Sequence, residues 1–364
     1  MDISKQSQSS GDNSQLIQAQ TVIIQGITEQ RAREIFDEKF AITKRDLTVE
    51  AINEAQSRIR KLEEKLIPKM QKIDKSLRSF ADPSFQMLLV EAQKSAASSE
   101  REEDYNLLSE LLIKRITSGE NRNERAGIHH AIQIVDNVSS SALQALTLFY
   151  ICNLVKPTND LILGLNALNN EYMKFMSAPL PLGMDWIEHL DLLRAVRINS
   201  FGKFPDIEQV IVQICGDFAE VGIEKTTNIY NDATKQLSAC GLAANSVFVD
   251  NQVLNGYARI NISSEKDIDT LVLYNNIAGH SFSTPLNENQ KSVLKTIRNM
   301  YSKDSKLLQS MKDWVIKQWN SYEYLHSFSD WWKQLPISFD VTTAGIVLAN
   351  ANANRIDSSI PKIQ

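Results

Sequence analysis

The alternation of apolar and polar residues near the N-terminus predicts a β-strand. Ser14–Gln25 contains no proline, glycine or charged residue. Alternate side chains of a strand point to the same face, and one face here is the more apolar. That face carries Ile17, Ala19, Thr21 and Ile23. The other face mixes aliphatic residues with glutamines, so we expect a strand with one better apolar side.

An amphipathic helix is predicted directly after this strand. Gly26 ends the strand, Thr28 is a suitable N-cap, and Glu29 places a negative charge in the first helical turn. The apolar side of that helix would carry Ala32, Ile35, Phe36 and Phe40.

The predicted strand needs a partner, because the residues that follow it are helical in pattern. Ordering its backbone costs about 1–2 kcal/mol per residue, and burying each aliphatic side chain returns about 1.5–3 kcal/mol. We therefore expect strands from several copies to pair and form a homo-oligomer. The residues predicted to hold it together are Ile17, Ala19, Val22, Ile23 and Ile24. A disordered N-terminal arm is the alternative.

A long helix with a heptad pattern is predicted from Thr48 to Arg78, with a kink near Glu64 caused by Pro68. Its sevenfold spacing is typical of a coiled coil and could give a second contact between copies. The heptad positions are Ile52, Ile59, Leu66 and Ile73. A basic stripe lies beside them and is interpreted as a solvated face or, alternatively, a nucleic-acid surface. It consists of Arg58, Lys61, Lys65, Lys69 and Lys72.

The remaining pattern predicts a mainly α fold. Asp82-Pro83 is a strong helix start, and short amphipathic helices follow it. Pro179–Gly183 breaks the pattern, which divides the chain into an N-terminal strand arm (1–28), a helical domain (29–178) and a second, largely helical domain (183–364). In the second domain, helices are expected over Asp185–Arg197 and Val221–Gln236, among others.

Two short segments of the second domain resemble each other, Leu237–Asn245 and Val341–Asn350. In each, a hydroxyl residue can cap a helix and a glycine one turn later permits close packing. The capping residues are Ser238 and Thr342, and the glycines are Gly241 and Gly345. This aliphatic–Ser/Thr–x–x–Gly sequence is similar to the one that begins the last helix of many winged-helix domains. Asn255-Gly256 predicts a β-hairpin that could be the wing, but its only basic residue is Arg259, so packing is favoured over DNA binding.

Composition limits the partners and the compartment. The 364-residue chain has a net charge of −5, which argues against a general nucleic-acid-binding surface. Its three cysteines are far apart in apolar surroundings, which indicates a reducing, cytoplasmic environment. The N-terminus is too polar for a signal peptide, and no run approaches the roughly 20 apolar residues of a membrane span.

Known catalytic motifs do not occur in the sequence. It has no Walker A loop and no GxGxxG, HExxH or GxSxG motif. His129 and His130 are adjacent, so they cannot face one metal from a helix. We therefore predict no cofactor and no metal, and the catalytic residues of an enzyme, if it is one, stay unknown. Four of the five tryptophans lie between Trp314 and Trp332, where core packing is favoured over a ligand-stacking surface.

Several short motifs resemble a family of uncharacterised bacterial proteins. The resemblance begins with a Gly-Asp-x-Ser header at Gly11–Ser14, continues through Gln18-Ala19 and Gly26–Thr28, and extends to Ala32–Phe36. Phe80–Gln86 and Thr342–Gly345 also fit it. A similar header precedes NTPase or effector modules in some proteins thought to defend bacteria against phage. The resemblance implies a cytoplasmic helical protein with a defence role, and it supplies no catalytic residues.

Two functions remain open from the sequence. The favoured one is a non-enzymatic interaction or assembly protein that oligomerises through its strand and contacts a protein partner. The alternative is an effector enzyme or toxin, directed at nucleic acid, with its activity in the C-terminal domain.

Overall fold

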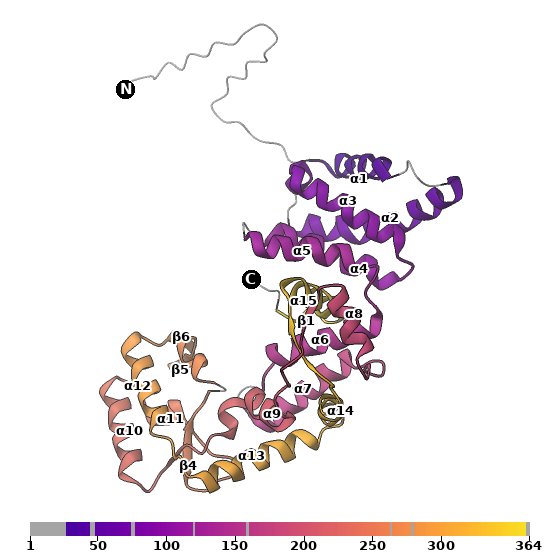
Figure 1. Cartoon of the computed structure of the whole chain (residues 1–364). Coiled ribbons are helices and arrows are strands. Elements are labelled where there is room, and N and C mark those ends of the chain that lie inside the picture. The colour runs from indigo at the N-terminus through magenta and orange to yellow at the C-terminus, as the bar shows by residue number, and fades with distance from the viewer. Residues whose placement is uncertain are drawn as a thin grey trace, which may run out of the picture.

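The computed structural model describes residues 27–43, 48–73, 77–118, 121–157, 160–262, 264–277 and 280–361. Across these ranges the chain is mainly helical, which confirms the predicted fold class (Figure 1). The predicted strand arm lies outside them. The helices are α1 (Glu29–Thr43), α2 (Val49–Ile73), α3 (Pro83–Ser98), α4 (Glu102–Thr117), α5 (Arg122–Ile134), α6 (Ser140–Leu154), α7 (Leu161–Phe175), α8 (Asp185–Leu192), α9 (Ile207–Cys215), α10 (Asn228–Ala239), α11 (Ala244–Val247), α12 (Glu288–Asn299), α13 (Ser305–Asn320), α14 (Glu323–Trp332) and α15 (Thr343–Ile356).

Helices α1 to α5 stack at one end of the molecule. Thr28 caps α1 as predicted, because its Oγ1 accepts a hydrogen bond from the Arg31 N–H at 3.2 Å. Helix α2 continues through Pro68 and ends at Ile73, and a separate 3-10 turn occupies Arg78–Ala81. The apolar side of α2 packs against α3 and α4 within the chain. Its buried residues are Ala55, Ile59, Leu62, Leu66, Ile67 and Met70.

The basic stripe on α2 is matched by carboxylates on α4. Lys61 and Lys65 both approach Glu102, at 3.3 and 3.4 Å, and Lys69 lies 2.8 Å from Glu110. These lysines therefore contribute to the contact between two helices of the same chain, and they present less free positive charge than the sequence alone suggests.

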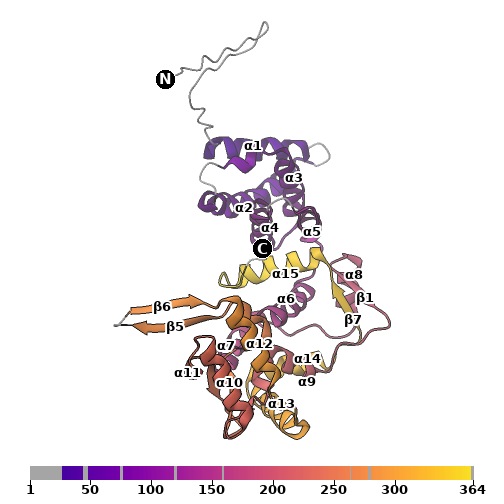
Figure 2. The same cartoon turned by 90° about the vertical axis from the view of Figure 1, so that its left-hand side faces the viewer.

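Helix α15 joins the two halves of the helical array. It lies between α4 and α5 on one side and α6 on the other (Figure 2). Ten of its 14 residues are buried. Around it, one hydrophobic core extends from Ala32 to Ile360, on both sides of the Pro179–Gly183 break. The domain limits predicted at residues 178 and 183 stay a prediction.

A two-stranded sheet fixes the start of α15. Strand β1 (Val196–Asn199) pairs antiparallel with β7 (Ser338–Val341), so the helix predicted over Asp185–Arg197 is wrong beyond Leu192. The partner strand is distant in sequence, and nothing local to β1 indicates it. As predicted, Thr342 caps α15 by accepting from the Gly345 N–H at 3.1 Å.

Gly345 permits the close approach expected of it. A Cβ at this position would lie 2.0 Å from the Ala195 carbonyl oxygen. The matching prediction at the other segment is wrong. Ser238 lies inside α10, where its hydroxyl donates to the Thr234 carbonyl, and Gly241 has open space around it and a φ of +79°.

A second, smaller core is formed by residues from Ile223 to Tyr301. Residues of α10 to α12 and of the three-stranded sheet β2-β4-β3 build this core, and the hairpin β5-β6 forms a separate sheet. The strands are β2 (Ile223–Glu224), β3 (Phe248–Asp250), β4 (Tyr257–Ile260), β5 (Val272–Ile277) and β6 (His280–Pro285). Strand β2 replaces the first part of the helix predicted over Val221–Gln236. The Ser302 N–H donates to the Gly222 carbonyl at 2.8 Å, so this body enters and leaves the helical array at one point.

The hairpin predicted at Asn255-Gly256 is confirmed as β3-β4. Its one basic residue, Arg259, is buried. The guanidinium donates to the carbonyls of Ile260 and Ile262 and lies 4.4 Å from the centre of the Phe218 ring. Arg259 therefore holds the smaller body against the array and does not face outward.

The aromatic residues near the C-terminus pack mainly in the core, as predicted. Trp319, Phe328, Trp331 and Trp332 are buried. The Trp319 indole N–H donates to the Leu325 carbonyl at 2.9 Å. None of the described helices combines the length and the apolarity that crossing a bilayer requires.

Candidate functional site

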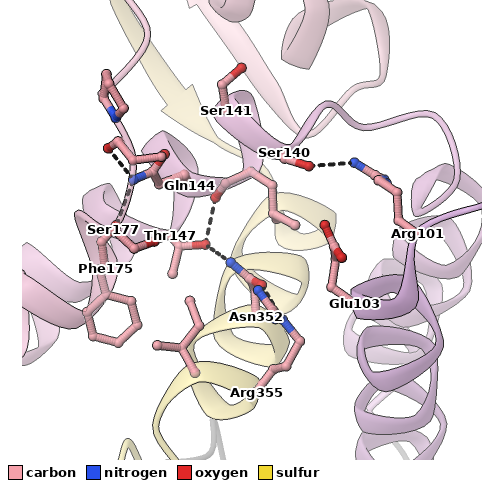
Figure 3. A pocket seen from close by; sticks show the side chains of 14 residues that line it. Arg101, Glu103, Ser140, Ser141, Gln144, Thr147, Phe175, Ser177, Asn352 and Arg355 are labelled. Atoms are coloured by element: carbon pink, nitrogen blue, oxygen red, sulfur yellow. Dashed lines mark hydrogen bonds between the residues drawn. The ribbon is translucent and has the colours of Figure 1, made fainter.

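A cavity of about 370 Å³, with both polar and apolar residues in its lining, lies where the N-terminal helices, the middle helices and α15 meet (Figure 3). Its walls come from the start of α4, the first half of α6, the end of α7 with the segment after it, and the last turns of α15. These elements are distant in sequence, so only the folded chain assembles the cavity. Its size lies within the range of small-molecule sites.

One wall is built around Arg101, whose charge is neutralised within the fold. Its guanidinium donates to the Asp104 carboxylate at 3.0 Å, to the Ser140 hydroxyl at 3.1 Å and to the Val135 carbonyl at 2.9 Å. Asp104 is fully buried, and burial raises its pKa, an effect opposed by Ser99 and Arg101. Arg101 is therefore a structural residue that ties α4 to the start of α6.

The opposite wall is a chain of hydrogen bonds between α6 and α15. Asn352 donates to the Thr147 hydroxyl at 2.8 Å, and Thr147 donates to the Leu143 carbonyl at 2.6 Å. The Asn352 amide oxygen accepts from Arg355 Nε at 2.9 Å. This chain fixes the position from which the Arg355 side chain extends.

Two charges in the cavity remain unpaired within the described part of the chain. Glu103 and Arg355 both line it, and neither forms an ion pair there. Partial burial lowers the pKa of the Arg355 guanidinium, while the negative charges of Glu103 and Asp104 oppose that shift. Arg355 as a whole is still exposed to solvent at the mouth of the cavity. A carboxylate and a guanidinium thus share one cavity without neutralising each other by direct contact.

Three hydroxyl residues in and beside the cavity, Ser139, Ser140 and Thr147, serve structural roles. Ser139 caps α6 by accepting from the Ala142 N–H at 3.3 Å, and the nearby His189 ring accepts from the Ser139 backbone N–H. Ser140 and Thr147 are engaged as described above. A nucleophilic hydroxyl needs a base hydrogen-bonded to it, and Ser140 and Thr147 have other partners.

The residues predicted from the sequence to join copies of the chain lie outside the described part of the structure. They are Ile17, Ala19, Val22, Ile23 and Ile24. The histidine pair has a structural place, since His130 Nε2 lies 2.9 Å from the Leu193 carbonyl oxygen. Within the described ranges, no group of three or more His, Cys, Asp or Glu residues could hold a metal ion.

Sequence reasoning missed the cavity, although one residue pattern includes Asn352, which lines it. Asn350, Asn352 and Asn354 alternate with alanines in an apolar helix, and all three are buried. Buried amides require partners. This pattern could have indicated a polar contact inside the fold, but nothing local identifies α4 and α6 as the other walls.

Comparison with known proteins adds a family but no activity. No curated protein and no solved structure matches the chain. A family model matches residues 26–361, and its description consists only of a “-like” label that states no activity. Because the match covers most of the sequence, the chain belongs to that family of uncharacterised proteins.

Proposed function

We propose that this protein is a non-enzymatic interaction and assembly protein of the bacterial cytoplasm, which forms homo-oligomers through the strand Ser14–Gln25. The resemblance of its N-terminal header to that of presumed anti-phage proteins supports a role in phage defence. The contacts between copies would be made by Ile17, Ala19, Val22, Ile23 and Ile24.

The observation that carries the proposal is the two-stranded sheet β5-β6, whose outer edges have no neighbouring strand among the described strands. Strands β5 and β6 pair only with each other among the described strands, and Figure 2 shows the hairpin extending away from the body. Residues 272–285 include no Asp, Glu, Lys or Arg. Isolated two-stranded hairpins are marginally stable in water, and natural proteins usually protect free strand edges with charge. Because the edges of the hairpin β5-β6 are open and uncharged, we expect them to pair with a strand from another molecule.

The same argument applies to the N-terminal segment, which is also uncharged and strand-forming in pattern. Two of the four heptad residues of α2, Ile59 and Leu66, are buried, and the helix packs against α3 and α4. Ile52 is half-buried and Ile73 is exposed. We therefore base the assembly on strand pairing and assign no contact between copies to α2.

The test is the mass of the full-length protein in solution. Multi-angle light scattering at micromolar concentration should give a multiple of the 41.1 kDa chain. The double variant Ile17→Lys/Ile23→Lys, which charges the better apolar face, should shift the mass toward the monomer. The matched control Gln18→Lys/Gln20→Lys adds the same charge to the other face and should retain most of the assembly.

Two results would contradict the proposal. One is a wild-type protein that is monomeric at micromolar concentration. The other is an Ile17→Lys/Ile23→Lys variant whose mass equals that of the wild type.

A further inference from the structure

The cavity between α4, α6, α7 and α15 combines two opposite charges with an apolar surface. Arg101 contributes no free charge, because the Asp104 carboxylate neutralises it. Glu103 enters the cavity from α4 and Arg355 from α15, as Figure 3 shows. The remaining charges are therefore one carboxylate and one guanidinium, held by two different helices.

The Arg355 guanidinium is oriented for a ligand. Its Nε donates to Asn352, which is itself fixed by Thr147. Within the described chain, the two terminal nitrogens of Arg355 have no hydrogen-bond acceptor. A guanidinium held through Nε presents these nitrogens side by side, which is the geometry that binds a carboxylate through both oxygens.

The apolar part of the lining suits the hydrocarbon portion of a small molecule. Leu143, Phe175, Pro179 and Ile356 contribute apolar surface. A site with a few fixed polar groups and an apolar wall is typical of small-molecule binding. The volume of about 370 Å³ accommodates a molecule of roughly amino-acid size.

We propose that this cavity binds a small zwitterion with an apolar side chain, such as a free aliphatic or aromatic α-amino acid. Glu103 accepts hydrogen bonds from the ammonium group, Arg355 binds the carboxylate, and the apolar side chain lies against Phe175 and Leu143. The proposal is independent of strand-mediated assembly, since the cavity lies within one chain.

Isothermal titration calorimetry with the full-length protein tests each charge separately. The probes are L-leucine, L-methionine and L-phenylalanine, each with its N-acetyl derivative, which lacks the ammonium, and its amide, which lacks the carboxylate. At least one amino acid should bind, and its two derivatives should bind at least about tenfold more weakly, because a charge-assisted hydrogen bond is lost in each.

Two variants assign the groups. Glu103→Gln should abolish the preference over the N-acetyl derivative, and Arg355→Gln should abolish the preference over the amide. Glu102→Gln is a matched control, since Glu102 faces Lys61 and Lys65 on α2. Arg122→Gln on the exposed start of α5 is the control for the arginine. Both controls should bind as the wild type does.

The proposal is overturned if the wild type binds none of the three amino acids at millimolar concentration. It is overturned as well if each amino acid binds with the same affinity as its N-acetyl derivative and its amide. It is also overturned if the two cavity variants retain wild-type selectivity. Because the probe series is measured on the wild type, a variant that fails to fold does not prevent the test.

Discussion

The buried asparagines of α15 determine how this helix packs. Asn350 donates to the Tyr150 hydroxyl at 2.9 Å and to the Pro361 carbonyl at 3.0 Å, and Asn354 donates to the Asn350 carbonyl at 2.9 Å. A buried amide without a partner costs several kcal/mol in apolar surroundings. A rotation or shift of α15 would separate Asn350 from Tyr150 and Asn352 from Thr147, which both lie on α6. These two asparagines therefore specify one position of α15 against α6, whereas the Asn354 bond lies within α15 itself.

Two buried cysteines should be unreactive toward alkylating reagents in the folded protein. Cys152 and Cys215 are 3% and 0% exposed, and burial raises the pKa of each thiol to about 12. Only the thiolate reacts with alkylating reagents. At pH 8 the thiolate fraction is then about one in ten thousand.

We predict that iodoacetamide at pH 8 labels the native protein only at Cys240, which is partly exposed. In denaturant all three cysteines should be labelled. Intact-mass spectrometry before and after unfolding gives the two counts. Rapid labelling of Cys152 or Cys215 in the native state would show that the core opens around them.

Helix starts were predictable where a capping residue follows a non-helical segment. Asp82 accepts from the Ser84 N–H at 2.9 Å, as its position before Pro83 indicates. Ser238 and Thr342 occupy similar motifs, yet only Thr342 is a cap. The difference lies in the preceding residues. Strand β7 ends directly before Thr342, so a helix can begin there, whereas Ser238 already lies inside α10. Strand β1, like the cavity, depends on a distant partner, and no local pattern encodes it.

Gly345→Ala should destabilise the protein. The added Cβ would overlap the Ala195 carbonyl oxygen at 2.0 Å, and backbone cannot move aside as a flexible side chain can. Overpacking of this kind costs about 1–3 kcal/mol or more. Urea unfolding followed by circular dichroism measures the change. Ile346→Ala, at a partly exposed position of the same turn, is the control and should cost less. Equal stability of Gly345→Ala and the wild type would mean that α15 can move away from β1.

At the scale of the whole molecule, an ion pair connects the two cores. Arg298 of the smaller body donates to both carboxylate oxygens of Asp217, at 3.1 and 2.8 Å. Asp217 is 1% exposed and lies in the 3-10 turn Gly216–Ala219, which packs against α13. Nearby carboxylates, with Asp217 the largest contributor, raise the pKa of Arg298.

Replacing Arg298 by Met should destabilise the fold by about 3–5 kcal/mol, because it leaves the Asp217 carboxylate buried without a counter-charge. The double variant Asp217→Asn/Arg298→Met should recover much of that loss, since the buried group is then neutral. Urea denaturation of the two variants and the wild type provides the comparison. If the single and double variants are equally unstable, the loss comes from packing and not from the unpaired charge.

The central place of α15 has a consequence for synthesis on the ribosome. Helix α6 ends at Leu154 and α15 begins at Thr343, so about 190 residues are translated between them. At roughly 5–20 residues per second this interval lasts about 10–40 s. During that time the surfaces of α4, α5 and α6 that α15 later covers have no partner and stay available to chaperones. The array can therefore close only late in translation, after the smaller body has already emerged.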